Sequence, residues 1–215
     1  MKRQNRFSVS SRRWLSRAQR DIYGVRGQSL GFRSRAAAKL LWLDKACGLL
    51  RAGQCLLDLG AAPGGWSGVA LRHKGMRVIG VDTHDVAPMA GLQMLRGDVR
   101  DRHLLAVIRQ AAGEGVLFDG VLADIAPPSS GHKALDHQRQ IILARHAFLL
   151  ALFLLKQNGF FLCKVYQGAE SERLFARLCH HFYGCRRLKP PSSRAESVEF
   201  YVVGRLRRCR TVGVA

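Results

Sequence analysis

The chain has 215 residues, 47% of them hydrophobic, so it can bury the core of one globular domain and is not a largely disordered protein. Its net charge of +20, from 35 Lys and Arg against 15 Asp and Glu, predicts a polyanionic partner. The same charge disfavours an enzyme that acts on small molecules.

Basic residues are concentrated at the two ends of the chain. Residues 1–40 contain eleven Lys and Arg against one acidic residue, and residues 186–215 contain eight against two. A basic surface that serves only solubility would be more evenly charged, so this distribution indicates nucleic-acid binding. We expect residues 1–31 to form a basic arm, 32–204 a folded domain and 205–215 a basic tail.

The arm interleaves guanidinium groups with aromatic rings, a mixture that pairs with phosphates and stacks on bases, as in Arg12, Arg13, Trp14 and Arg17. The alternative is a tail that becomes ordered only against the domain. From Ser34 onward, the spacing of apolar residues predicts a helix that ends at Gly48. Lys39 lies in this helix, where an isolated lysine ordinarily faces solvent.

Residues 56–67, LLDLGAAPGGWS, predict a short strand, a glycine-rich turn and a helix that begins near Trp66. Asp58 comes just before the turn. The spacing is neither G-x-G-x-x-G nor a phosphate loop, so the turn suits a ligand without phosphates, such as S-adenosylmethionine. The alternative is a tight connection that binds nothing.

Strands and helices alternate through the rest of the chain, which predicts an α/β fold. We expect strands at 76–81, 92–95, 118–123, 160–166, 185–188 and 198–203. We expect helices at 66–73, 100–112, 136–156 and 170–182, the third ended by Asn158-Gly159.

Four aspartates, Asp58, Asp82, Asp98 and Asp124, each fall at or near the carboxyl end of a successive strand. Any one of them alone is compatible with a helix N-cap. Because the carboxyl ends of parallel strands meet at one crevice, the four together predict a ligand site, with Asp82 placed to hold a ribose diol.

Lys164 lies inside the apolar run F-F-L-C-K-V-Y, where burial of an unpaired ammonium is costly. It is either a functional residue or a strand-end lysine that reaches water.

Metal and membrane sites are not indicated by the sequence. The six cysteines form no C-x-x-C pair, and the eight histidines show no ligand-like spacing, so we expect reduced thiols and no metal. The longest apolar run, 141–155, contains Arg145 and His146 and is too short to cross a bilayer.

Over residues 12–204 the chain resembles the FtsJ/RrmJ family of S-adenosylmethionine-dependent RNA ribose 2′-O-methyltransferases. The motifs that carry the resemblance are GFRSRAAAKL, LLDLGAAPGGWS, DIAP, KVYQG and KPPSSRAESVEFYVV. The opening SRRWLSRAQRDIYG is similar to the bacterial large-subunit rRNA members. The resemblance implies a Rossmann-like class I methyltransferase fold: a mostly parallel seven-stranded sheet with an antiparallel last strand and helices on both faces.

The resemblance also implies a site. The family's catalytic Lys–Asp–Lys–Glu tetrad is matched by Lys39, Asp124, Lys164 and Glu199. The expected cofactor-binding residues are Asp58, Gly60, Gly64, Gly65, Trp66, Asp82, Asp98 and Asp124. The arm and three further arginines, Arg33, Arg35 and Arg194, are expected to contact RNA. Pro128, where the family often has Asn, and Ala38, where an aromatic residue is common, depart from the family pattern.

The expected activity is methylation of a ribose 2′-hydroxyl of 23S rRNA, at a uridine of the peptidyl transferase A-loop on the assembled or assembling large subunit. Lys164 would be the general base, for which it would need a lowered pKa when it acts. The alternatives are a tRNA or mRNA-cap ribose methyltransferase and a catalytically silent ribosome-assembly factor. We expect a monomer in the bacterial cytoplasm, in preference to a mitochondrial protein.

Overall fold

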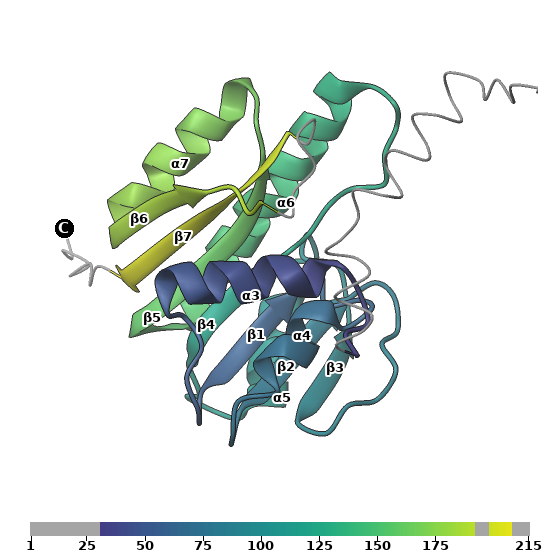
Figure 1. Cartoon of the computed structure of the whole chain (residues 1–215), viewed down its shortest axis with the longest axis vertical. Coiled ribbons are helices and arrows are strands. Elements are labelled where there is room, and N and C mark those ends of the chain that lie inside the picture. The colour runs from purple at the N-terminus through teal and green to yellow at the C-terminus, as the bar shows by residue number, and fades with distance from the viewer. Residues whose placement is uncertain (1–30, 192–197, 208–215) are drawn as a thin grey trace, which may run out of the picture.

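The computed structural model describes residues 31–191 and 198–207, which form one sheet with helices around it (Figure 1). The strands are β1 Cys55–Leu59, β2 Arg77–Asp82, β3 Leu92–Arg96, β4 Phe118–Ala123, β5 Leu155–Tyr166, β6 Phe182–Leu188 and β7 Glu199–Arg207. The helices are α3 Ala36–Cys47, α4 Gly65–Ala70, α5 Leu104–Ala112, α6 Lys133–Leu154 and α7 Ala169–His181.

The seven strands follow the order β3-β2-β1-β4-β5-β7-β6. β1 pairs in parallel with both β2 and β4, whereas β7 is antiparallel to β5 and to β6. The expected mostly parallel sheet with an antiparallel last strand is therefore confirmed. The strand order reverses between β1 and β4, and in such sheets ligands bind beside the carboxyl ends of the strands at this point.

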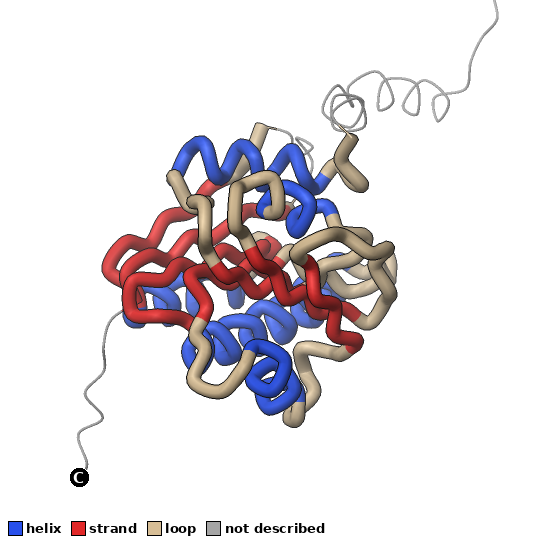
Figure 2. The backbone as a smooth tube through the Cα atoms, turned by 90° about the horizontal axis from the view of Figure 1, so that it is seen from below, coloured by secondary structure: helices blue, strands red, loops and turns tan. Residues whose placement is uncertain are grey.

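Two hydrophobic cores lie on opposite faces of the sheet, and helices cover both faces (Figure 2). Successive side chains of a strand point to opposite faces. Leu57 and Leu59 of β1 therefore join the core beneath α5, α6 and α7, while Leu56 joins the core beneath α3 and α4. Burial on both faces explains why the central strands are almost continuously apolar.

The boundary between α6 and β5 differs from the one expected. α6 ends at Leu154, and Leu155 is already extended and pairs with Phe118 of β4. The next pair in register is Gly120 with Phe160, so residues 156–159 form an irregularity within β5. Asn158-Gly159 therefore lies in the strand and does not end the helix.

The last strand is also longer than expected. β7 continues to Arg207, so residues 205–207 belong to the sheet and not to a tail. Arg205 donates hydrogen bonds to the carbonyl oxygens of Cys47 (2.7 Å) and Gly48 (2.9 Å), which tie β7 to the end of α3. Gly48 ends α3 in the left-handed conformation, as the sequence predicts.

Candidate active site

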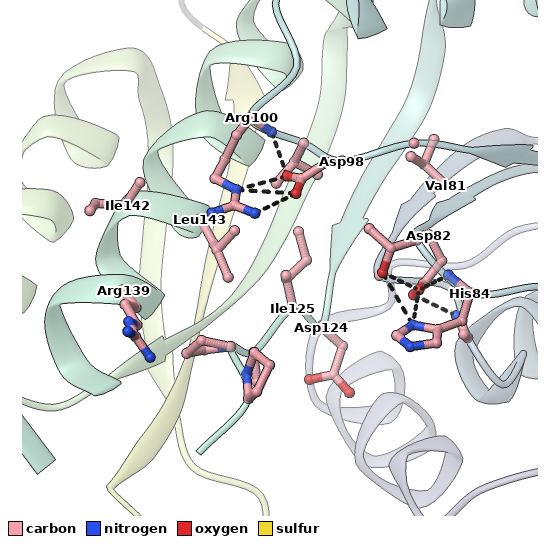
Figure 3. A pocket seen from close by; sticks show the side chains of 18 residues that line it. Val81, Asp82, His84, Asp98, Arg100, Asp124, Ile125, Arg139, Ile142 and Leu143 are labelled. Carbon is pink, nitrogen blue, oxygen red and sulfur yellow. Dashed lines mark hydrogen bonds and ion pairs between the residues drawn. The ribbon is translucent and has the colours of Figure 1, made fainter. Parts of the chain in front are cut away.

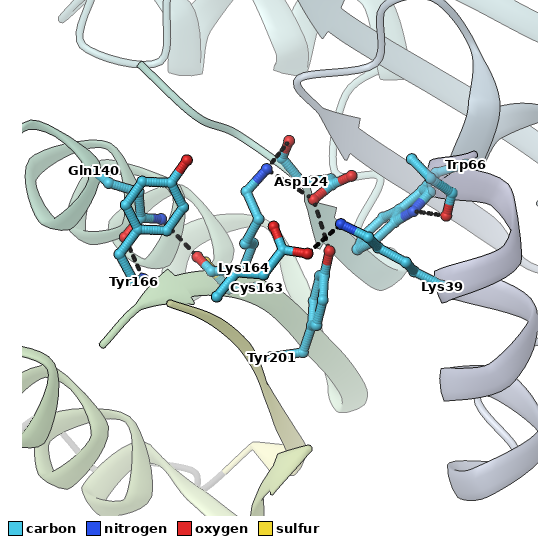
Figure 4. Close-up of polar contacts among 10 residues, drawn as sticks. Lys39, Trp66, Asp124, Gln140, Cys163, Lys164, Tyr166 and Tyr201 are labelled. Atoms are coloured by element: carbon cyan, nitrogen blue, oxygen red, sulfur yellow. Dashed lines mark hydrogen bonds and ion pairs between the residues drawn. The ribbon is translucent and has the colours of Figure 1, made fainter. Parts of the chain in front are cut away.

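The four residues of the expected tetrad converge from four separate elements, and Figure 4 labels three of them, Lys39, Asp124 and Lys164. Lys164 of β5 places its Nζ 3.0 Å from Asp124 Oδ1 and 3.2 Å from the Asp124 carbonyl oxygen, just after β4. Lys39 of α3 forms an ion pair with Glu199 of β7. The tetrad therefore consists of two lysine–carboxylate pairs. A fifth residue, Tyr201, donates its hydroxyl to Asp124 Oδ1 at 3.1 Å.

Burial makes the Lys164–Asp124 pair the electrostatic centre of this network. The side chain of Lys164 is 9% exposed and that of Asp124 is 13% exposed. Burial alone lowers the pKa of Lys164, but the charge of Asp124 and its hydrogen bond outweigh burial, so the pKa of Lys164 is raised. Lys164 is therefore an ammonium group at neutral pH in this arrangement, the opposite of what a general base needs.

Gln140 of α6 holds the strand that carries Lys164. Its side-chain amide donates to the carbonyl oxygen of Lys164 (2.7 Å) and accepts from the backbone N–H of Tyr166 (3.0 Å). Gln140 is 1% exposed. Sequence reasoning missed this residue and also Tyr201. The available signal for Gln140 was a polar residue at helical spacing from Ala144 and Ala147, which are buried on the same helix.

A cavity of about 770 Å³ opens at the carboxyl ends of β1, β2 and β4 (Figure 3). Three of the four predicted aspartates, Asp82, Asp98 and Asp124, line it. Gly60 of the glycine turn and Pro128 also line it, as does the α6 face that carries Arg139. The crevice expected from the strand-end carboxylates therefore exists, and Asp124 belongs both to the cavity and to the lysine network.

The aspartates of the cavity are held in different ways. Asp82 accepts hydrogen bonds from the backbone N–H groups of Ala62 (3.0 Å) and His84 (2.9 Å), so it connects the glycine turn to the connection after β2. Asp98 forms an ion pair with Arg100 at 2.5 Å, and hydrogen bonding to Arg100 lowers the pKa of the Asp98 carboxyl.

Glycine is required in the turn because other chain segments pack directly on it. Gly60 and Gly64 have positive φ values of 78° and 99°. A Cβ at Gly60 would lie 2.9 Å from Ile125 Cγ1, and one at Gly64 would lie 2.8 Å from Met89 Cε. Gly65 is packed more tightly still, because a Cβ there would lie 2.1 Å from Ser34 Oγ.

Asp58 and Trp66 lie behind the turn and do not line the cavity. Asp58 is fully buried, and its Oδ2 accepts a hydrogen bond from Ser67 Oγ at 2.6 Å. Burial raises the pKa of Asp58 to about 7. The Trp66 indole donates to the carbonyl oxygen of Ala36 (2.9 Å) and packs near Tyr201, with 5.8 Å between the ring centroids. Gly64 and Gly65 do not line the cavity either, and the cofactor contacts of all eight expected residues remain predictions.

Most of the expected RNA contacts lie outside the described residues: Arg12, Arg13, Trp14, Arg17 and Arg194. Arg33 and Arg35 are both exposed. Arg33 donates hydrogen bonds to the carbonyl oxygens of Ala87 (2.5 Å) and Pro88 (3.0 Å).

Neither a metal site nor a membrane-spanning helix is found in the described part of the chain. Residues 31–191 and 198–207 contain no cluster of three or more His, Cys, Asp or Glu side chains suited to a metal ion. No helix within these ranges is long and apolar enough to span a membrane.

A family model described as FtsJ-like methyltransferase matches residues 32–207. The chain belongs to this family. As an FtsJ-like methyltransferase it has close curated relatives, among them three proteins named Ribosomal RNA large subunit methyltransferase E. The protein from Granulibacter bethesdensis is 40% identical over 95% of this chain and 88% of its own length. The corresponding figures are 41%, 90% and 69% for Maricaulis maris, and 40%, 95% and 86% for Brucella canis.

Solved structures place this FtsJ-like methyltransferase in the same fold class. A crystal structure from Plasmodium falciparum, assigned as a ribosomal RNA methyltransferase, has a TM-score of 0.73 and 26% identity over 82% of this chain and all of that one. An rRNA-methylase assignment from Clostridium thermocellum has a TM-score of 0.52 and 13% identity over 77% of this chain and 94% of that one, which shows the fold alone. The Rossmann-like methyltransferase fold is thereby confirmed.

Proposed function

We propose that this FtsJ-like methyltransferase transfers a methyl group from S-adenosylmethionine to a ribose 2′-hydroxyl of 23S-type rRNA in the large ribosomal subunit. The observation that carries the proposal is the convergence of Lys39, Asp124, Lys164 and Glu199 beside the cavity. The relatives named for the large-subunit RNA support the substrate, and the net charge of +20 supports a polyanion. A uridine of the peptidyl transferase A-loop is the expected nucleotide, and the bacterial cytoplasm the expected location.

The cavity fits S-adenosylmethionine in size and in the chemistry of its walls. Its volume of about 770 Å³ lies within the range of small-molecule sites, roughly 300–1,000 Å³. Asp82 would hold the ribose hydroxyls, Asp98 the adenine side, and Asp124 the region beside the sulfonium. When bound, the cofactor supplies a methyl group that is already activated for attack by a nucleophile.

The residues of the chain would then align the hydroxyl in line with that methyl group and remove its proton. We assign the proton removal to Lys164, whose Nζ lies 3.0 Å from Oδ1 of Asp124, a residue that lines the cavity. Asp124 opposes this role, because its charge raises the pKa of Lys164. Positive charge brought next to Asp124 would weaken that effect and lower the pKa of Lys164. Lys39 and Glu199, the second lysine–carboxylate pair, would orient the ribose.

The decisive experiment measures transfer of labelled methyl groups to large ribosomal subunits from a strain that lacks the modification. Free 23S rRNA, tRNA and capped RNA run in parallel, and the Lys164→Ala protein is the catalytic control. We expect alkali-resistant label at one nucleotide of the subunit, absent with Lys164→Ala, whose cofactor binding stays intact. Label confined to tRNA or capped RNA would reject the rRNA substrate, because the 2′-hydroxyl chemistry would then act on another RNA. Absence of label from every RNA, despite measurable cofactor binding, would favour a silent assembly factor.

A further inference from the structure

The connection between β2 and β3, residues 83–91, begins at the cavity and continues over the glycine turn. Thr83 and His84, its first two residues, line the cavity beside Asp82. Further along, Val86 and Met89 point inward: a Cβ at Gly64 would lie 3.0 Å from Val86 Cγ1 and 2.8 Å from Met89 Cε. The connection therefore links the cavity, at Thr83 and His84, to the glycine turn, at Val86 and Met89.

The connection has little of its own to hold it in place. Most of its residues are exposed, and Val86 and Met89 are only partly buried. Segments with few buried apolar contacts open at low free-energy cost. A side chain from elsewhere in the fold that fixes the connection would therefore have a large effect on its position.

Arg33 makes this attachment from the other side of the turn. Its guanidinium donates one hydrogen bond to the carbonyl oxygen of Ala87 (2.5 Å) and another to that of Pro88 (3.0 Å). The Arg33 side chain also lies on the turn itself, with Cδ 3.4 Å from a Cβ placed at Gly64. Two successive carbonyls bound by one planar group define the orientation of the connection, which the single ammonium of a lysine would not do.

The neighbours of Arg33 fix its position in turn. Phe32 is buried, and the guanidinium of Arg72 lies 3.8 Å from the centre of its ring. Ser34 packs directly on Gly65. The backbone on both sides of Arg33 is therefore anchored against α4 and the turn. This anchoring limits the positions of the Arg33 side chain and favours the one that makes the two hydrogen bonds.

We propose that Arg33 is a positioning residue of the cofactor site, which holds the 83–91 connection over the glycine turn. The ligand in this inference rests on the proposed function. The connection also braces Asp82, because the backbone N–H of His84 donates to Asp82 Oδ1 at 2.9 Å. Arg33 thus acts on cofactor binding through the connection and through Asp82, a role different from the RNA contact expected from the sequence.

Loss of this attachment lowers the fraction of molecules in which the connection is in place, and the apparent dissociation constant rises by the same factor. We expect Arg33→Ala to weaken cofactor binding about tenfold, within the range that such a population change produces. Arg35→Ala is the matched control. It removes the same charge two residues away, from an exposed side chain that makes no hydrogen bond to residues 83–91.

The experiment titrates S-adenosylhomocysteine into the full chain without RNA, by calorimetry, for the wild type, Arg33→Ala, Arg33→Lys and Arg35→Ala. Hydrogen exchange of residues 83–91 is measured on the same ligand-free proteins. We expect weaker binding and faster exchange in Arg33→Ala, partial recovery in Arg33→Lys, and wild-type behaviour in Arg35→Ala. Wild-type affinity and exchange in Arg33→Ala, or equal effects of both alanine variants, would overturn the inference. If the wild type itself bound no cofactor, the proposed function would fail, and exchange alone would decide whether Arg33 holds the connection.

Discussion

Replacement of Lys164 by methionine tests the lysine network most directly, because it removes the ammonium and keeps most of the side-chain volume. In the wild type, Lys164 Nζ lies 3.0 Å from Asp124 Oδ1, and both side chains are largely buried. Removing one partner of a buried ion pair costs about 3–5 kcal/mol, since the other charge is left uncompensated. The Tyr201 hydroxyl still donates to Asp124, so we expect a loss near the lower end, about 3 kcal/mol.

A loss of that size is easy to measure. For a chain of this length, about 3 kcal/mol corresponds to a fall in Tm of roughly 6–12 °C at neutral pH. Adding Asp124→Asn removes the uncompensated charge, so the double variant should be more stable than the sum of the two single effects predicts. Thermal unfolding followed by circular dichroism on all four proteins gives the interaction energy of the pair.

The same variants test the catalytic role. General-base catalysis contributes about 10²–10⁴ in rate, so we expect Lys164→Met to lose about a thousandfold in turnover on large subunits. Its cofactor affinity should stay near that of the wild type. A folded Lys164→Met protein with turnover within tenfold of the wild type would remove Lys164 from the mechanism. An unchanged Tm, with no coupling to Asp124→Asn, would show that the buried pair contributes nothing.

Three further variants test individual contacts. Burial raises the pKa of Asp58 from 3.8 to about 7, so the folded state retains a proton that the unfolded state releases, and stability falls as pH rises through this window. Asp58→Asn should remove this pH-dependent loss of stability, which is at most about 4 kcal/mol. An equal change of Tm between pH 5 and pH 8 in the wild type and in Asp58→Asn would contradict this prediction. Gln140→Leu removes the side-chain partner of the Lys164 carbonyl and of the Tyr166 N–H; we expect a loss of about 2 kcal/mol in thermal unfolding and lower turnover at unchanged cofactor affinity. Arg100→Ala should raise the pKa of the Asp98 carboxyl toward its ordinary value, because the hydrogen-bonding guanidinium is gone, and carboxyl NMR titration measures this directly.

The helices and strands were predictable because short stretches of the sequence indicate them. Continuous apolar runs flanked by glycine or aspartate marked β1, β2 and β4, and each of the five described helices lies where a helix was expected. The errors occur where pairing decides the boundary. Asn158-Gly159 has the local chemistry of a helix end, yet β5 begins at Leu155 because Phe118 offers a partner there. β7 likewise continues to Arg207 because β6 pairs with it as far as that residue.

The site was predictable in its membership and not in its contacts. The resemblance named the four tetrad residues, and strand-end carboxylates indicated the cavity. It could not say which lysine pairs with which carboxylate, because Lys39 and Glu199 are 160 positions apart. The partners of Gln140 and Arg33 lie 24 and 54 positions away, and no local pattern encodes such contacts.

The pKa of Lys164 shows why such contacts matter to the chemistry. Burial and opposite charge act on this lysine in opposite directions, and Asp124, 3.0 Å away, makes the largest contribution to the raised pKa. Lys39 does not weaken the effect of Asp124 on this pKa, because Lys39 forms its ion pair with Glu199. Lys164 therefore becomes a base only when another cation also interacts with the Asp124 carboxylate. Asp124 lines the cavity, where such a cation could bind. In the proposed reaction Asp124 thus links binding of the cofactor in the cavity to the pKa of Lys164. Lys164 can then accept a proton only while a methyl donor is bound.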